Sequence, residues 1–131
     1  MKTKKIIAVA AAAVLLVSTA VMPAGAVSSY WTLTKQEYQT YSATLGLYNY
    51  GYVEYLRNSA SSDDGVNLYL DYSIPGNGWT NKIHLFADPG KSDSATGKYM
   101  APSKSSWRGN MKSWWPSGRN CAAEGKIHAY G

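Results

Sequence analysis

The segment best suited to recognising another molecule runs from Ser106 to Arg119, because it interleaves indole rings with cations. As a strand it would place Trp107, Met111 and Trp115 on one face. As a helix it would also gather its indoles on one face, beside the cations. Both forms are amphipathic, a property that favours a membrane interface or a glycan. The alternative is a Trp-rich core wall with the cations outside. The candidate binding residues are Trp107, Arg108, Lys112, Trp114 and Trp115.

Residue types for catalysis are present, but their spacing does not assemble a site. No serine lies in a G-x-S-x-G elbow. Cys121 and His128 lie seven positions apart, which on one strand puts them on opposite faces and more than about 20 Å apart. Asp63 and Asp64 lie in a Ser/Gly-rich stretch, where capping a turn is their ordinary role. We therefore expect no catalytic residue.

The sequence also contains no residue pattern typical of a metal or cofactor site. His84 and His128 are the only histidines, and neither has further ligands at metal-binding spacing. Both fall on the outward phase of an expected strand, so we expect both to face solvent. Cys121 is the only cysteine, which excludes an internal disulfide, and its phase in the last strand predicts a buried thiol. We expect no metal and no cofactor.

The first twenty-six residues resemble a secretion signal. Three lysines precede an apolar run from Ile6 to Val17, and Ala24-Gly25-Ala26 offers small residues for cleavage. The run is short for a transmembrane span, although an uncleaved anchor is the alternative. We expect residues 1–26 to be a signal peptide and 27–131 to be one secreted, extracellular domain. This style of signal favours a Gram-positive bacterium.

Charge is unevenly distributed in the expected mature chain. Residues 27–97 carry four basic and seven acidic residues, whereas residues 98–131 carry six basic residues and one acidic residue. Either the two parts pack as neighbouring strands and neutralise each other, or the second part offers a basic face to an anionic envelope component such as teichoic acid or anionic lipid. The overall balance of ten basic and eight acidic residues does not indicate nucleic-acid binding.

The elements that would position these residues are strands. Apolar and polar residues alternate over 66–74 and again over 79–87, and Pro75-Gly76-Asn77-Gly78 between them predicts a hairpin. Residues 121–130 alternate as a last strand with small inward residues, which implies that something bulky packs against it. Residues 58–65 predict a loop, and a short strand is expected at 97–101. The chain has eleven Tyr and one Phe, a ratio that suits thin sheets whose side chains are partly exposed to solvent.

The region before the loop allows two interpretations. Thr34 and Glu37 form a capping-box pattern, which predicts a short helix or turn over 34–39. We favour strands near 41–47 and 52–57, and a loose start over 27–32. The alternative is one long helix, because an apolar stripe has helical spacing at Tyr38, Tyr41, Leu45, Tyr48, Tyr52 and Tyr55. The predicted fold is all-β, a small antiparallel sandwich or barrel that allows one short N-terminal helix.

These features favour a secreted, non-enzymatic binding protein that acts at a cell surface or on a polysaccharide through exposed Tyr and Trp. The expected partner is a cell-surface glycan or an anionic envelope component. The first alternative is an antibacterial, bacteriocin-like or membrane-active protein that uses the basic C-terminal third at a membrane interface. The second is a small secreted hydrolase. The sequence does not predict an oligomeric state.

Overall fold

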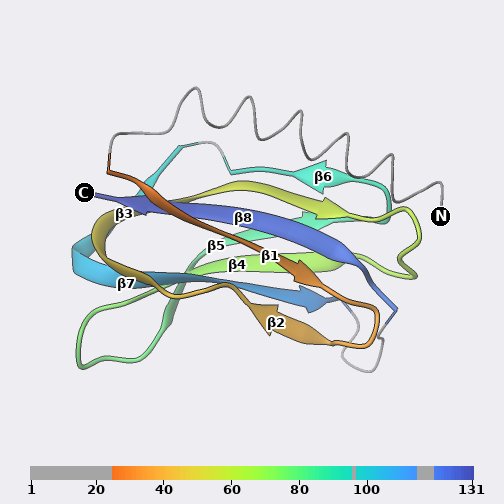
Figure 1. Cartoon of the computed structure of the whole chain (residues 1–131), viewed down its shortest axis with the longest axis horizontal. Helices are drawn as coiled ribbons and strands as arrows, with labels where there is room; N and C mark the ends of the chain where they lie inside the picture. Colours follow the sequence, from red (N-terminus) through yellow and green to blue (C-terminus); the bar gives the residue numbers. More distant parts are fainter. Residues whose placement is uncertain (1–24, 96, 115–119) are drawn as a thin grey trace.

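The computed structural model describes residues 25–95, 97–114 and 120–131, and every regular element among them is a strand (Figure 1). The predicted signal peptide and Trp115 therefore lie outside the described residues, apart from Gly25 and Ala26. Among the described residues, no helix is long and apolar enough to cross a membrane. The strands are β1 (Val27–Leu33), β2 (Gln39–Tyr41), β3 (Leu45–Asn58), β4 (Val66–Ser73), β5 (Thr80–Ala87), β6 (Ser92–Asp93), β7 (Tyr99–Ser113) and β8 (Ala123–Tyr130).

The strands form one antiparallel sheet in the order β1-β8-β3-β7-β4-β5, with β2 added beside β7 and β6 beside β3. The two long strands each change partners along their length. β3 pairs with β7 through its first half and with β8 through its second half, while the second half of β7 pairs with β4. Register shifts interrupt the β3–β7 ladder near Tyr48, and such bulges bend a strand. The sheet is thereby folded over on itself.

The folded sheet encloses one core between two layers. The first layer is β1-β8-β3 and the second is β2-β7-β4-β5; Figure 1 shows β1 and β8 lying across β4. Trp31 of β1 lies against Gly109 of β7, and a Cβ on Gly125 of β8 would come within 2.8 Å of Leu68 on β4. The two layers of the sheet therefore touch through their side chains, and the predicted all-β antiparallel fold, a small sandwich or barrel, is confirmed.

Several expected elements are confirmed. β4 and β5 form the predicted hairpin around residues 74–79, and Ile83, Leu85 and Ala87 point into the core. The small residues of β8 are packed by a tryptophan as expected, since Trp31 lies over Gly125. The loop expected over 58–65 is confirmed except at its first residue, since β3 includes Asn58 and β4 begins at Val66. The Trp-rich segment takes the strand form from Ser106 to Ser113, and β7 joins this part to the short strand expected at 97–101; residues 115–119 of the segment lie outside the described residues.

Other boundaries were wrong in part. The loose start over 27–32 is a strand, because each inward residue of β1 finds a place in the core: Ser29, Trp31 and Leu33 are buried. The strand expected near 52–57 is confirmed as part of β3. The strand expected near 41–47 is wrong in its bounds, since β2 ends at Tyr41 and β3 begins at Leu45 and runs on without a break to Asn58. The helix alternative is wrong, because β-bonding satisfies the backbone over that whole region.

The capping-box residues form a turn and not a helix. The Glu37 carboxylate accepts hydrogen bonds from the backbone N–H and the hydroxyl of Thr34, at 3.0 and 2.9 Å, and the Glu37 N–H donates to the Thr34 carbonyl. These are contacts of a helix start. The chain leaves this geometry at once, since Gln39 already pairs with Lys112 of β7. Pairing with β7 therefore prevails over local helix propensity.

The contact of Trp31 with Gly109 provides a test of the layer packing. A Cβ on Gly109 would overlap Cη2 of Trp31, whose rigid ring is enclosed in the core, so Gly109→Ala should lower the free energy of unfolding by about 1–3 kcal/mol. Gly46→Ala is the matched control, because a Cβ there meets only Cε2 of Tyr48 at 3.8 Å. Denaturant unfolding measures both. Equal stability of the two variants would contradict the packing described here.

Candidate functional site

The outer surface of the second layer carries a continuous group of polar and aromatic side chains. Alternation along β7 produces it: Trp107 and Met111 are turned into the core, so Arg108, Asn110 and Lys112 face outward. The register then places Asp71 of β4 opposite Arg108. We call this surface the outer face; its residues are Gln39, Tyr41, Asn67, Tyr69, Asp71, Trp79, Asn81, His84, Arg108, Asn110 and Lys112.

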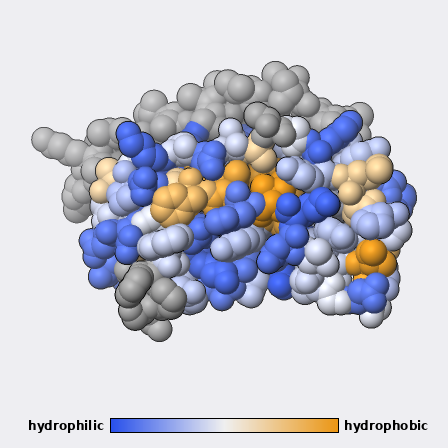
Figure 2. All heavy atoms as spheres, turned by 180° about the vertical axis from the view of Figure 1, so that it is seen from behind, coloured by the Kyte–Doolittle hydropathy of each residue, from blue (hydrophilic) through white to orange (hydrophobic). Residues whose placement is uncertain are grey.

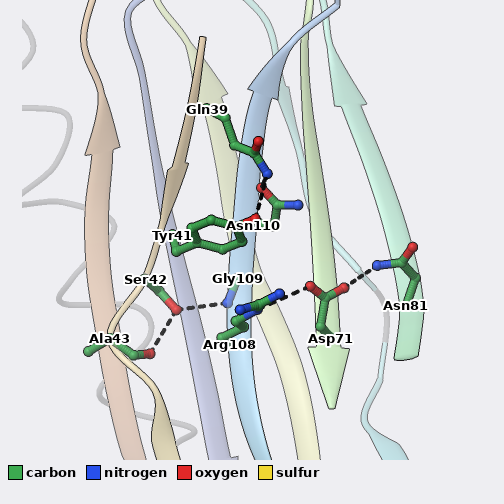
Figure 3. A network of polar contacts seen from close by, with 9 residues as sticks. All are labelled: Gln39, Tyr41, Ser42, Ala43, Asp71, Asn81, Arg108, Gly109 and Asn110. Carbon is green, nitrogen blue, oxygen red and sulfur yellow. Dashed lines mark hydrogen bonds and ion pairs between the residues drawn. The ribbon is translucent and has the colours of Figure 1, made fainter. Parts of the chain in front are cut away.

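A buried carboxylate organises the centre of the outer face. Asp71 is 1% exposed, yet its two oxygens face different partners: one accepts from the amide of Asn81 and the other from Nε of Arg108 at 3.5 Å (Figure 3). A buried carboxylate is costly unless it is paired and hydrogen-bonded, and both conditions are met here. Asp71 therefore holds Arg108 and Asn81 in fixed positions.

Arg108 is also held by two aromatic rings. Its guanidinium carbon lies 4.3 Å from the ring centroid of Tyr41 and 4.1 Å from that of Trp79. Tyr41 belongs to β2, on one side of β7, and Trp79 precedes β5, on the other side. The guanidinium is thus stacked between two partly exposed rings, an arrangement that favours a cation electrostatically.

The chain around Tyr41 is fastened to β7. The Gly109 N–H donates to the Ser42 hydroxyl at 2.7 Å, and that hydroxyl donates to the Ala43 carbonyl at 2.8 Å. The Gln39 amide donates to the Tyr41 hydroxyl and to the Asn110 side-chain oxygen, at 2.9 and 2.8 Å (Figure 3). These contacts fix the position of the Tyr41 ring although half of its surface is exposed.

A second group lies beside the Arg108 cluster on the same face. The rings of Tyr69 and His84 are stacked, with centroids 4.6 Å apart, and Nζ of Lys112 lies 5.3 Å from the Tyr69 centroid. The His84 ring nitrogen Nε2 is 2.6 Å from the Asn67 side-chain oxygen. His84 is exposed, as the sequence predicts. The outer face therefore presents rings, amides and cations in neighbouring rows.

The five predicted binding residues have different positions. Trp107 is fully buried and donates its indole N–H to the Tyr48 carbonyl at 2.9 Å, so it belongs to the core. Arg108 and Lys112 lie on the outer face. Trp114 is 55% exposed and meets the ring of Phe86 edge-on at 5.4 Å. Trp115 lies outside the described residues. The structure thus separates Trp107 from the cations that flank it in the sequence.

The sequence analysis missed most partners of Arg108. Tyr41, Trp79 and Asn81 are brought to it by strand pairing and not by spacing. One signal was present: Asp71 interrupts the apolar strand 66–74 at an outward position, where a carboxylate needs a cationic partner. That partner was not identifiable, because it lies thirty-seven residues away in the chain.

A second polar cluster lies on the first layer, and it corrects the expectation for His128. This histidine is fully buried and not exposed, because Tyr52 stacks on its ring at 4.7 Å and Glu54 pairs with its Nε2. Lys126 lies 3.8 Å from the same Glu54 oxygen. A histidine beside a carboxylate is one element of a hydrolase site, but this one is covered by Tyr52. Burial lowers the pKa of His128, Glu54 opposes the shift and Lys126 adds to it.

The buried histidine makes stability depend on pH. Because its folded-state pKa lies below the ordinary 6.5, the unfolded chain binds more protons in mild acid. The stability that depends on a neutral His128 ring is therefore fully present above about pH 6.5, and it is lost as the pH falls toward the lowered pKa. His128→Gln, which can still donate to Glu54, should flatten the decline of Tm between about pH 7 and pH 5. An unchanged slope in thermal denaturation would contradict this assignment.

The position of Cys121 and the pairing of opposite charges agree with the expectations from the sequence. Cys121 is buried and unpaired, its thiol contacts the Asp64 carbonyl at 3.4 Å, and burial raises its pKa. Among the described residues no group of three or more His, Cys, Asp or Glu is placed to hold a metal. The acidic and basic parts of the chain pair across strands, through Arg108–Asp71 and Lys126–Glu54, as the neutralising interpretation predicted.

Comparisons with known proteins add little. No protein-family model matches the chain, and no curated protein resembles it in sequence. Among solved structures, the Yersinia pseudotuberculosis-derived mitogen matches with a TM-score of 0.40 and 17% identity, covering 82% of this chain and 86% of that chain. A likeness at this level carries no argument about function.

The positions of Trp107 and Trp114 predict opposite behaviour on substitution. Trp107→Ala should lower the free energy of unfolding by about 3–5 kcal/mol, because it empties a fully enclosed site. Trp114→Ala, at a 55% exposed position, should cost less than about 1 kcal/mol. Chemical denaturation of the two variants measures the difference. A large loss for Trp114 and a small one for Trp107 would reverse the assignment.

Proposed function

We propose that this chain is a secreted, non-enzymatic binding protein that uses the outer face to bind a glycan at a cell surface or in a polysaccharide. The observation that carries the proposal is the stacking of Arg108 between the partly exposed rings of Tyr41 and Trp79. The secreted part rests on the signal-like residues 1–26. The binding part rests on the chemistry of the face.

The outer face offers the two kinds of contact that a sugar needs. An aromatic ring presents a negative face, which attracts the weakly positive C–H groups of a pyranose. An amide can both donate to and accept from hydroxyl groups, and the exposed side chain of Asn81 donates to Asp71 while its oxygen has no side-chain donor among the described residues. Rings and amides alternate across four neighbouring strands, which suits an extended ligand lying across them.

The same face suits a membrane less well. In a membrane-active surface, cations lie beside an apolar face that enters the lipid. Here Arg108 and Lys112 lie over rings that share their face, and Lys126 is buried in an ion pair on the other layer. From behind, hydrophilic residues cover most of the surface and hydrophobic ones form small separate patches (Figure 2). These features favour a glycan over a lipid surface.

A matched pair of tyrosines tests the proposal. Tyr41 on the outer face is 48% exposed, and Tyr30 on β1 is 51% exposed; each hydroxyl makes one side-chain hydrogen bond. Tyr41→Ala and Trp79→Ala should each weaken binding to the glycan about five- to thirtyfold, as the loss of a binding hot spot does. Tyr30→Ala should leave binding unchanged.

Binding of the purified chain is first measured with Gram-positive cell walls and with a panel of soluble polysaccharides. The variants are then titrated against each ligand that binds. Thermal unfolding of each variant shows that it is folded. Equal loss of affinity in Tyr30→Ala and Tyr41→Ala would contradict the outer face as the site. The absence of any glycan ligand would contradict the function itself.

A further inference from the structure

We infer that the outer face selects an acidic polysaccharide, one whose sugars carry carboxylate groups, and that Arg108 reads the carboxylate. This inference rests on the proposed function and names its class of ligand. It follows from three features of the face: the geometry of the slot around Arg108, the balance of exposed charge, and the spacing of the two cations.

The rings around Arg108 leave only one direction of approach. The guanidinium carbon lies over the rings of Tyr41 and Trp79, 4.3 and 4.1 Å from their centroids, and Asp71 contacts Nε. Among the described residues, no side chain bonds to the two terminal nitrogens, and 23% of the side chain is exposed. We infer that a partner reaches the two terminal nitrogens in the guanidinium plane, because the rings occupy the space above Cζ and Asp71 occupies Nε. A planar carboxylate fits that direction and accepts two parallel hydrogen bonds, whereas a tetrahedral phosphate places oxygens out of the plane, toward the rings.

The guanidinium is also held in its binding position before an anionic ligand binds. Stacking and the Asp71 contact already fix its rotamer, so binding loses little side-chain entropy. Replacing the arginine by lysine would keep the charge but lose the planar pair of donors, which makes Arg108→Lys a specific probe of this geometry.

The charge exposed on the outer face is cationic. The face holds one carboxylate, Asp71, which is 1% exposed and already bonded to Asn81 and Arg108. Lys112 keeps its ammonium over the Tyr69 ring, and its stem is partly exposed. An acidic chain laid over the face would thus meet two cations and no exposed carboxylate of the face itself. Complementarity of this kind gives specificity for the charged ligand.

The distance between the two cations suits a polymer and not a single sugar. Arg108 and Lys112 lie on the same face of β7 four residues apart, or about 13 Å along the strand. That distance exceeds the span of a single pyranose ring. The ring of Tyr69 lies near Lys112, and the rings of Tyr41 and Trp79 lie at Arg108. A chain of sugars could place one carboxylate at Arg108 and a later one at Lys112.

The test compares two polymers that share a backbone. Polygalacturonate carries a carboxylate on every sugar, and its methyl ester carries none. In calorimetric titration at low salt, the chain should bind the free acid at least about tenfold more tightly than the ester, as expected for a charge-assisted bidentate contact. Arg108→Lys should remove most of that preference, because it should lower the affinity for the free acid by a larger factor than the affinity for the ester. Lys112→Gln should reduce it by a smaller factor.

Lys91→Gln is the matched control, because Lys91 is an exposed lysine in the turn before β6, away from the strands that carry the outer face, and it should leave the preference unchanged. If Arg108→Lys does not fold, two measurements still test whether the preference for the free acid is electrostatic. They are the effect of Lys112→Gln and the loss of the preference in added salt. Equal affinity for acid and ester would overturn the inference and leave the proposed function standing. Tighter binding of polyglycerol phosphate than of polygalacturonate would overturn the assignment to carboxylate. Binding of no glycan at all would overturn both proposals.

Discussion

The close approach of the two layers depends on one indole ring lying across two glycines. Trp31 of β1 fills the space that side chains at Gly109 of β7 and Gly125 of β8 would occupy. Trp107 packs against Gly51 of β3 in the same way. A few large rings therefore supply much of the packing between the layers. This matters in a short chain that has no internal disulfide. Because Trp107 and Gly109 must face inward for this packing, Arg108 and Asn110 must face outward. The core thus determines the composition of the outer face.

The two layers each carry a buried carboxylate with a cation, and the surroundings of each pair differ. On the first layer, Tyr52 stacks on His128, which pairs with Glu54, and Lys126 has only 8% of its side chain exposed. On the second, the carboxylate of Asp71 is buried but its partner Arg108 reaches the surface between two partly exposed rings. A buried ion pair adds little net stability over an apolar pair. Its value at Asp71 is positional, because it fixes a cation where a ligand can reach it.

Sequence patterns predicted the parts of the fold that depend on neighbours in the chain. Alternation identified the hairpin of β4 and β5, the inward phase of Cys121 and Ile127, and the strand form of the Trp-rich segment as one of two possibilities. Features that depend on distant strands were not accessible. His128 has an outward phase in its strand, and only the pairing of β3 with β8 brings Tyr52 and Glu54 over it. Arg108 and Lys112 were identified from the sequence, whereas Tyr41, Trp79 and Asp71 became their neighbours through pairing alone.

The helical spacing of tyrosines over 38–55 shows how one pattern can arise from two structures. In the folded chain these tyrosines belong to the turn after β1, to β2 and to β3, where a bulge near Tyr48 changes the phase of the strand. A strand whose phase shifts partway presents apolar residues at mixed intervals, and mixed intervals imitate helical spacing. The bulge also allows β3 to leave β7 and continue beside β8. The bend that closes the sheet over its core is therefore the feature that obscured this strand in the sequence. The second half of β7, which carries the outer face, lies beyond the start of β3 and pairs with β2 and β4.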